Sequence, residues 1–363
     1  MAHILIVSER FWPEGSGGTL ATYLITRLLA TCDFKVTVIT GTCNPVKINN
    51  VNFIYDKAFR IPNKPARWLY FLNSSTKKRH RNLMKKFDII YIPYGYPLIP
   101  LAKELDKKVI VHLHDYQPVA FNSTILHERD DMHINLISGI KKELTYELFE
   151  HGSITRAIAG SLLTIIAMLC RKWVAEADVL ICVSRRQAEI ISKLAPELAY
   201  KIKVVYNPLP ETPPLEKKFK EPTFVYSGGG SYVKGFQVFV RGALKVLRRG
   251  NSADFLLTGG LRGFKPYQEE ALKRLNSVYI GKFRLLGFLP YGDVLRLYSK
   301  SHAVLVPSIW EEPLPYVVME AMAVGTIPIV SRVGGIPEIV EGTYGERQLF
   351  TPGNVDELVD RME

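Results

Sequence analysis

The stretch Pro307-Ser-Ile-Trp-Glu-Glu-Pro-Leu-Pro-Tyr-Val-Val-Met-Glu320-Ala-Met-Ala-Val-Gly325 places two acids on either side of a strand-to-helix turn. The apolar run at 303–306 predicts a buried strand, and 316–324 predict a helix that begins near Pro315 and ends at Gly325. Glu312 then follows the carboxyl end of a strand, where open parallel sheets bind their ligands. Amide groups at a helix start favour an anion such as a diphosphate, whereas a carboxylate suits neutral hydroxyl groups. A nucleotide sugar offers both.

The same run resembles the paired-glutamate signature of the retaining GT-B glycosyltransferases of family 4. Its continuation, Ile327-Pro-Ile-Val-Ser-Arg-Val-Gly-Gly-Ile-Pro-Glu338, is similar to that family's usual sequel. The resemblance implies that Glu312 contacts the donor sugar and that Glu320 holds the ribose hydroxyls. The competing interpretation is two solvated acids that stabilise the helix dipole modestly.

The turn also departs from the family's pattern. Leu314-Pro315 stands where the family commonly has Phe-Gly, and proline donates no amide hydrogen bond. The resemblance still places Leu314, Pro315 and Tyr316 at the donor, with one backbone contact fewer.

Apolar runs spread over the 363 residues predict two series of strands. The first lies at 3–7, 35–40, 88–92, 109–113 and 179–183, and the second at 223–226, 253–257, 283–286, 303–306 and 327–330. Helical patterns such as 19–30 alternate with them, which is typical of doubly wound parallel sheets. We predict an α/β protein with a first domain at 1–205, a linker rich in proline and charge at 206–220 and a second domain at 221–363. The resemblance implies the GT-B fold, in which two Rossmann-like domains face each other across a cleft, the first on the acceptor side and the second binding the nucleotide sugar.

Three further motifs follow strands. Gly17 and Gly18 form a glycine-rich turn after the first strand, and by resemblance their backbone approaches the donor phosphates. His114 and His112 alternate along one strand and therefore share a side of it, so the assignment of His114 to the reacting sugar rests on resemblance. A lone histidine beside an apolar strand is otherwise more often structural.

The second domain opens with Ser227-Gly228-Gly229-Gly230-Ser-Tyr-Val-Lys234. Gly228 lets the backbone approach a phosphate, and Lys234 supplies a cation for the leaving diphosphate. The family usually has an arginine at the position of Gly229, so Lys234 acts either with backbone amides alone or with a cation such as Arg262 or Arg332. The resemblance places Leu289 beside the nucleobase.

Positive charge is concentrated in the first half of the chain. Of the net charge of +12, residues 1–203 carry +10, from 28 Lys and Arg against 18 Asp and Glu. The segment 76–87 could lie on an anionic membrane surface, and an ordinary solvated helix is an equal alternative. The basic residues are not interleaved with aromatic residues, which argues against a nucleic-acid partner.

Two features indicate a cytoplasmic protein, with the inner face of the membrane as an alternative location. The amino terminus reads as a strand and not as a signal peptide. The four cysteines form no C-x-x-C pair and mostly lie in apolar segments, which predicts buried free thiols. They are Cys32, Cys43, Cys170 and Cys182. The apolar segment 154–174 predicts a buried helix, or as a second choice a monotopic membrane contact.

These features together predict a retaining, metal-independent glycosyltransferase of the hexosyltransferase type. It would move a sugar from a nucleotide-diphosphate-sugar donor to a hydroxyl of a glycan or lipid-linked acceptor. We expect no cofactor and no catalytic metal, because no D-x-D dyad follows a strand and the sequence has no His/Cys cluster. The alternatives are another enzyme on the same fold, such as a nucleotide-sugar epimerase, and a non-catalytic nucleotide-sugar-binding protein. Residues 354–363 predict a helix without a stop signal, where the family continues into further helices, so a truncated chain is expected.

Overall fold

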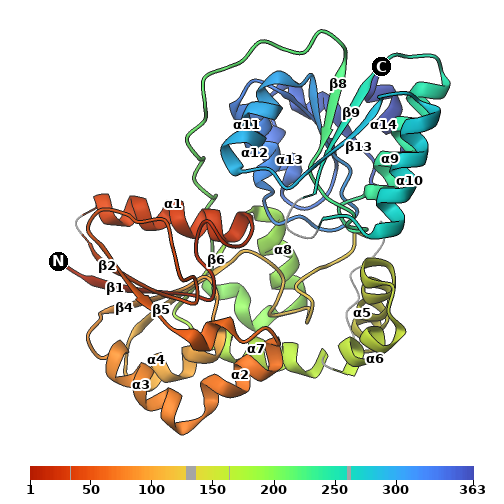
Figure 1. Cartoon of the computed structure of the whole chain (residues 1–363). Coiled ribbons are helices and arrows are strands. Elements are labelled where there is room, and N and C mark those ends of the chain that lie inside the picture. Colours follow the sequence, from red (N-terminus) through yellow and green to blue (C-terminus); the bar gives the residue numbers. More distant parts are fainter. Residues whose placement is uncertain (33, 128–135, 163, 260–262) are drawn as a thin grey trace. The chain divides into compact units, whose positions relative to one another are not determined.

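A computed structural model describes residues 1–363 apart from 33, 128–135, 163 and 260–262 (Figure 1). The chain forms two compact units. The first unit comprises Met1–Thr124, Met132–Leu144 and Ala157–Pro208, and the second comprises Ile125–Asp131, Thr145–Arg156 and Leu209–Glu363. The segments 125–131 and 145–156 thus group with the second unit although they come early in the chain.

The first unit is built on a seven-stranded parallel sheet of order β3-β2-β1-β4-β5-β6-β7. Its strands are β1 (His3–Ser8), β2 (Lys35–Thr40), β3 (Val51–Tyr55), β4 (Ile89–Ile92), β5 (Lys108–Leu113), β6 (Val179–Cys182) and β7 (Ile202–Val204). The helices between β1 and β7 are α1 (Gly17–Thr31), α2 (Lys64–Leu72), α3 (Ser74–Met84), α4 (Ile99–Glu104), α5 (Leu136–His151), α6 (Ile154–Leu162), α7 (Thr164–Ala175) and α8 (Arg185–Leu194), with short 3-10 helices at Lys57–Arg60, Tyr96–Leu98 and Pro196–Lys201.

The second unit repeats the plan with a six-stranded parallel sheet of order β10-β9-β8-β11-β12-β13. Its strands are β8 (Thr223–Tyr226), β9 (Asp254–Thr258), β10 (Phe283–Gly287), β11 (Ala303–Val306), β12 (Ile327–Ser331) and β13 (Leu349–Phe350). Its helices are α9 (Phe236–Arg248), α10 (Pro266–Val278), α11 (Tyr291–Lys300), α12 (Tyr316–Ala323), α13 (Ile336–Val340) and α14 (Val355–Met362), with a 3-10 helix at Tyr344–Gln348.

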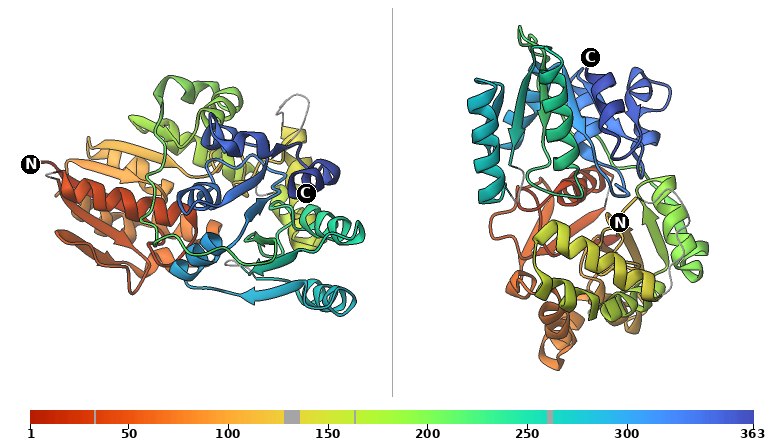
Figure 2. Two further views of the ribbon diagram at one scale, coloured as in Figure 1. Left: turned by 90° about the horizontal axis from the view of Figure 1, so that it is seen from above. Right: turned by 90° about the vertical axis from the view of Figure 1, so that its right-hand side faces the viewer.

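Helices cover both faces of each sheet (Figure 2). Crossover connections are right-handed, so when the chain adds strands on the other side of the first strand, the connecting helices lie on the opposite face of the sheet. In the first unit the chain moves from β1 to β3 and then returns to β4, beside β1. In the second it moves from β8 to β10 and returns to β11, beside β8. Both sheets therefore have a topological switch point, between β1 and β4 and between β8 and β11.

The predicted α/β class is confirmed, and every predicted strand is present within a residue or two. The sequence missed β3, β7 and β13, each of which lies at an edge of its sheet. An edge strand is buried on fewer sides and needs no continuous apolar run, so its signal in the sequence is weak. The predicted helix at the end of the chain is α14, which begins after the capping residue Asn354.

The prediction of a buried helix over 154–174 is wrong in part. This region contains α6 and α7, and four large apolar side chains on them are 43–69% exposed: Ile154, Ile158, Met168 and Leu169. The smaller Ala157 and Cys170 are buried on the inner sides of these helices. Within the described residues, no helix has the length and apolarity needed to cross a bilayer.

The prediction of buried thiols holds for Cys170 and Cys182 and is wrong for Cys32 and Cys43, which are exposed. Cys32 follows the last turn of α1, and Cys43 lies in the loop after β2, so neither side chain enters a packed element. All four cysteines are free.

Candidate active site

The switch point of the second unit brings the glycine-rich turn after β8 against the loop after β11. Gly235, just before α9, has φ +78°, and a Cβ there would lie 1.8 Å from the carbonyl oxygen of Pro307. Only glycine allows that approach. The two loops that carry Lys234 and Glu312 are consequently held together by backbone packing.

Glu312 is buried, with 3% of its surface exposed, and has three polar contacts. Lys234 Nζ donates to both carboxylate oxygens, at 2.6 and 2.9 Å, and Ser308 Oγ donates at 2.7 Å. The ammonium group of Lys234 also lies 5.1 Å from the centroid of the Trp310 ring. A buried carboxylate is tolerated when it is paired in this way.

Gly334 and Gly335, from the segment that continues the paired-glutamate run, pack against the backbone of the same loop. Gly334 has φ +53°, and a Cβ there would lie 1.9 Å from the carbonyl oxygen of Glu312. The Gly335 N–H donates to that oxygen at 2.8 Å. The Gly334 N–H donates to the Glu311 carboxylate at 2.9 Å. These contacts fix the direction of the Glu312 side chain.

Glu320 lies on α12 with 4% of its surface exposed. Burial raises the pKa of its carboxyl group from 4.5 to about 7, although a hydrogen bond from the Tyr291 hydroxyl, 2.7 Å away, opposes the shift. Burial and the nearby Glu320 also raise the pKa of Tyr291 and Tyr316. Near pH 7 the Glu320 carboxyl group therefore exists in both protonation states.

The remaining donor-side candidates lie around these two acids. Pro315 is the N-cap residue of α12, and Leu314 and Tyr316 beside it are buried. Leu289 follows β10 and is half-buried. A Cβ at Gly228 would lie 2.2 Å from the Tyr226 hydroxyl oxygen, so the glycine turn is closely packed.

The absence of the family's arginine at Gly229 has a steric cause. Gly229 has φ +58°, and a Cβ there would lie 2.5 and 2.8 Å from the carbonyl oxygens of Gly259 and Gly263. Backbone atoms at such distances leave no room for any side chain. Of the two substitutes considered for that cation, Arg332 is exposed and Arg262 lies outside the described residues.

Sequence reasoning missed Glu150, on the last turn of α5 in the part of the chain that belongs to the second unit. Its buried carboxylate accepts hydrogen bonds from Ser231 Oγ and the Tyr232 N–H, both at 2.8 Å, and from the Val233 N–H at 3.2 Å. The Phe149 ring stacks on Tyr232 with centroids 4.8 Å apart. No local pattern could have indicated this contact, because more than 80 residues separate its partners.

Segment 125–127 adds a second contact that the sequence did not indicate. Leu126 forms an antiparallel bridge with Trp310, and His127 Nδ1 lies 2.9 Å from the Glu311 carboxylate. Glu311, which adjoins Glu312, is thus a structural residue of this loop. The two acids have different surroundings although they are neighbours in the sequence.

In the first unit, the glycine turn and the strand-end histidine lie side by side. α1 begins at Gly17, and a Cβ at Gly18 would lie 2.1 Å from the Tyr94 hydroxyl oxygen and 3.1 Å from His114 Cβ. These residues follow β1, β4 and β5, at the switch point of this sheet. A glycine is required where the turn approaches the tyrosine and the histidine this closely.

His112 lies on β5 and His114 directly follows it, and their ring centroids are 4.3 Å apart. His112 is 1% exposed, and its Nδ1 is hydrogen-bonded to the Tyr91 hydroxyl, whereas His114 is only half-buried. Burial of the imidazole lowers the pKa of His114 to about 3, so the ring is neutral at physiological pH. His114 is the more accessible of the two, as its proposed contact with a ligand requires.

Among the described residues, no group of three or more His, Cys, Asp or Glu side chains is placed to hold a metal ion. Metal independence stays a prediction.

The chain matches two family models that together cover nearly all of it. Residues 15–211 match the model "Glycosyltransferase Family 4" and residues 211–363 match "Glycosyl transferases group 1". The protein belongs to the group 1, family 4 glycosyltransferases. The resemblance given by the paired-glutamate run is therefore confirmed.

Curated relatives agree with this assignment. The chain is 32% identical over 145 residues to the uncharacterized glycosyltransferase MJ1607 of Methanocaldococcus jannaschii, a match that covers 39% of this chain and 36% of that protein. It is 22% identical over 342 residues to one of the polypeptides of human phosphatidylinositol N-acetylglucosaminyltransferase, covering 93% of this chain and 63% of that one. The chain thus spans about a third to two thirds of the length of these relatives.

Solved structures of glycosyltransferases share the fold. The chain matches HepE of Anabaena, solved with UDP and glucose, with a TM-score of 0.65 and 16% identity over 100% of this chain and 89% of that one. It matches sucrose-phosphate synthase of Thermosynechococcus elongatus with the same scores and coverage. The GT-B assignment, two Rossmann-like parallel-sheet domains, is confirmed.

Proposed function

We propose that this protein is a retaining glycosyltransferase that moves a hexosyl group from a nucleotide-diphosphate sugar to an acceptor hydroxyl. The observation that carries the proposal is the pair of buried acids at the switch point of the second unit, Glu312 bound to Lys234 and Glu320 bound to Tyr291. Burial of carboxylates is costly unless they are paired, and a buried acid with a raised pKa such as Glu320 is typical of functional sites.

Each residue has a role in the proposed reaction. The C–O bond between the sugar and the diphosphate breaks through an oxocarbenium-like transition state, and negative charge develops on the leaving diphosphate. Lys234, the glycine turn at Gly228 and the start of α12 would stabilise that charge. Glu312 and the neutral His114 would orient the donor sugar, and Glu320 would bind the ribose hydroxyls.

The comparisons support a nucleotide sugar as the class of donor. HepE of Anabaena was solved with UDP-glucose, and starch synthase IV of Arabidopsis thaliana was solved with ADP and acarbose. These neighbours were solved with nucleotides that carry different bases, so a panel of donors is required.

Calorimetric titration with UDP-, GDP- and ADP-sugars in the presence of EDTA tests the donor site. One nucleotide class should bind, and the affinity should fall in Glu320→Ala and remain in Glu221→Ala, because Glu221 is exposed and precedes the amino end of β8, at the opposite end of the strand from the donor loops. If no nucleotide binds at millimolar concentration, with or without added Mg²⁺ or Mn²⁺, the proposal is wrong. Binding only with metal would contradict metal independence alone.

A non-catalytic nucleotide-sugar-binding protein is the second candidate, and the steric exclusion of the arginine at Gly229 favours it. The two candidates differ in turnover. Slow release of free sugar from the bound donor, abolished in Lys234→Ala, would support the enzyme, whereas tight donor binding with no turnover towards water or glycan acceptors would support the binding protein.

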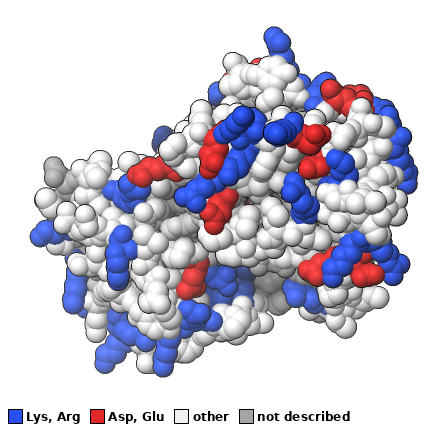
Figure 3. Space-filling view, turned by 45° about the horizontal axis from the view of Figure 1, so that its top comes forward, with Lys and Arg blue, Asp and Glu red and all other residues white. Residues whose placement is uncertain are grey.

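A peripheral contact with an anionic membrane at the cytoplasmic face is the proposed setting for a lipid-linked acceptor. Lys78, Lys85 and Lys86 are exposed on and after α3, and in Figure 3 the lower left of the view carries many Lys and Arg side chains. The apolar residues Met84 and Phe87 are buried, so this segment has no free apolar face to insert. The contact would be electrostatic and would weaken with salt. Sedimentation with phosphatidylglycerol vesicles but not phosphatidylcholine vesicles, lost at high salt, is the expected result.

A further inference from the structure

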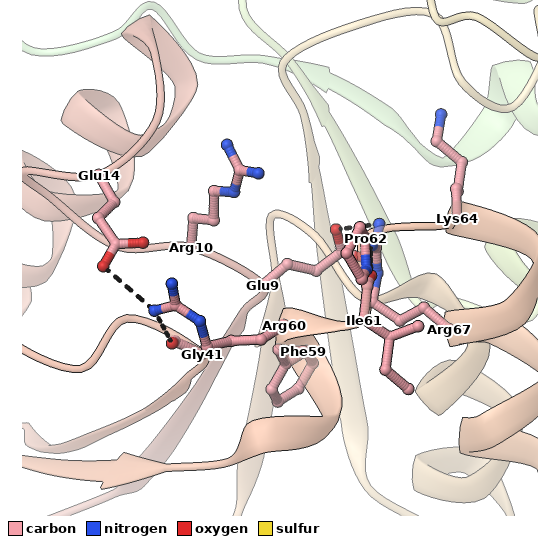
Figure 4. A pocket seen from close by; sticks show the side chains of 10 residues that line it. All are labelled: Glu9, Arg10, Glu14, Gly41, Phe59, Arg60, Ile61, Pro62, Lys64 and Arg67. Carbon is pink, nitrogen blue, oxygen red and sulfur yellow. Dashed lines mark hydrogen bonds and ion pairs between the residues drawn. The ribbon is translucent and has the colours of Figure 1, made fainter.

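A cavity of about 270 Å³ lies in the first unit beyond the carboxyl ends of β1 and β2 (Figure 4). Four of its lining residues are cationic and two are acidic: Arg10, Arg60, Lys64 and Arg67, with Glu9 and Glu14. Loops at this edge of a parallel sheet are where ligands bind. The donor-side roles proposed above leave this cavity unused.

Both acids in the cavity already have an arginine partner. Arg67 donates through Nε and Nη2 to the two carboxylate oxygens of Glu9, at 3.0 and 2.8 Å, and through Nη1 to the Ile61 carbonyl oxygen at 2.6 Å. Arg60 Nη1 lies 3.5 Å from the Glu14 carboxylate and donates to the Gly41 carbonyl oxygen at 3.2 Å. In each pair the carboxylate neutralises its arginine, so neither arginine adds net charge to the cavity.

Arg10 and Lys64 form no ion pair with any residue that the structure describes. Within the described part of the chain, the exposed guanidinium group of Arg10 makes no ion pair or hydrogen bond, and the Lys64 ammonium group donates only to the carbonyl oxygen of Phe121, at 3.1 Å. In Figure 4 both side chains extend towards the same side of the ribbon, with the Glu9–Arg67 pair between them. The cavity is thus lined by two cations that form no ion pair within the described residues.

The cavity is electrostatically linked to the strand-end site. Burial raises the pKa of Asp115, the residue after His114, while Lys64 lowers it and Glu9 raises it. Glu9 and Arg10 also follow β1 in the loop that leads to Gly17, at the same end of the sheet as His114. A molecule in the cavity would therefore lie at the end of the sheet that also carries the glycine turn and His114.

We propose that this cavity binds a phosphate group of the acceptor between Arg10 and Lys64. The inference rests on the proposed glycosyltransferase function, whose acceptor it specifies. A phosphate monoester carries a charge of about −1.5 to −2 at pH 7, which suits a cavity lined by two cations that have no ion-pair partner within the described residues. Arginine provides a planar pair of donors and lysine a point charge, a combination that suits phosphate oxygens. The volume is close to the lower limit of about 300 Å³ for small-molecule sites, so it has room for a phosphate with one sugar-sized group.

Calorimetric titration of the whole chain with glucose 6-phosphate, inorganic phosphate and unmodified glucose tests the inference. Both phosphates should bind and glucose should not, and Arg10→Gln and Lys64→Gln should each weaken phosphate binding about tenfold, as expected for one charge-assisted hydrogen bond. Lys35→Gln makes the same change of charge at the exposed amino end of β2, at the opposite edge of the sheet, and should bind phosphate like the unaltered chain. Affinities that are equal in all three variants, both for these phosphates and for vesicles that contain phosphatidic acid, would overturn the proposal.

Vesicles that contain phosphatidic acid, titrated with the same variants, distinguish a lipid phosphate from a soluble one. Loss of binding in Arg10→Gln with vesicles but not with soluble phosphates would identify the lipid as the source, and loss with soluble phosphates would identify a soluble acceptor. Donor titration of the same variants separates the two proposals. If Arg10→Gln binds the donor as the unaltered chain does, the glycosyltransferase proposal stands even when the substitution leaves phosphate binding unchanged. If neither the unaltered chain nor any variant binds a donor, the proposed function is refuted but the phosphate site is not.

Discussion

Replacement of Glu320 by glutamine should make the protein more stable at neutral pH. The carboxyl group has a pKa of about 7 in the folded state and 4.5 when unperturbed. Each pKa unit between folded and unfolded states is worth about 1.4 kcal/mol, so the ionised carboxylate costs the fold about 3 kcal/mol at alkaline pH. Glutamine has nearly the same shape, can still accept the hydrogen bond from Tyr291, and carries no charge.

The sign of the pH dependence follows from proton binding. Below pH 4.5 Glu320 is protonated in both states, and the variant and the parent should be equally stable. As the pH rises from 4.5 to about 7 the unfolded chain loses its proton first, which favours unfolding of the parent alone. The free energy of unfolding of Glu320→Gln should exceed that of the parent by a difference that grows over this range and reaches about 3 kcal/mol at about pH 8.

Urea unfolding at acidic, intermediate and mildly alkaline pH, about 4.5, 6 and 8, measures this difference. Glu221→Gln, at an exposed position, serves as the control and should differ little from the parent at any of these pH values. A Glu320→Gln variant that is less stable than the parent at the highest pH, or a difference that does not change with pH, would show that burial does not raise this pKa. The same variant should bind the donor more weakly, since a stabilising change at a ligand site commonly reduces function.

Three other predictions concern single positions. Gly229→Ala should lower the free energy of unfolding by more than about 2 kcal/mol, because its Cβ would meet two carbonyl oxygens. Gly250 has φ +85° and open space around it, so Gly250→Ala should lower the free energy of unfolding by only about 1 kcal/mol in the same urea assay. Similar losses in the two variants would contradict the steric account. Glu150→Ala should cost about 2 kcal/mol by leaving the Tyr232 and Val233 amides without their acceptor, and faster amide exchange at those two residues would locate the effect; unchanged exchange would count against it. The ring protons of His114 should show no titration by NMR around neutral pH, because its pKa is about 3, and a midpoint near the ordinary value of 6.5 would disprove the burial argument.

Local sequence patterns predicted most of the strands and both glycine turns. A buried strand of a parallel sheet needs a continuous apolar run, and a turn that meets another backbone needs glycine, so both leave marks within a few residues. The edge strands β3, β7 and β13 and the two-helix region of α6 and α7 were missed or misassigned, because their burial depends on neighbours that the local sequence does not specify.

The candidate site divides in the same way. The paired-glutamate run identified Glu312 and Glu320, but the sequence could not show that Lys234 binds Glu312 across 78 residues or that Tyr291 binds Glu320 across 29. It also could not explain the glycine at position 229, whose cause is the approach of Gly259 and Gly263. Glu150 and the cavity at Arg10 and Lys64 had no signal at all.

The α/β class, the positions of the central strands and the family could all be read from the chain, because hydrophobic period, glycine turns and a long contiguous motif are local properties. Which charges are neutralised, and which remain available to a ligand, depends instead on the folded arrangement. Glu9, Glu14 and Glu312 are each paired with a cation from a distant segment, whereas Arg10 has no such partner within the described residues. Charge pairing and burial depend on distances in space between residues far apart in the chain, and these set the pKa of Glu320 and the charge of the cavity.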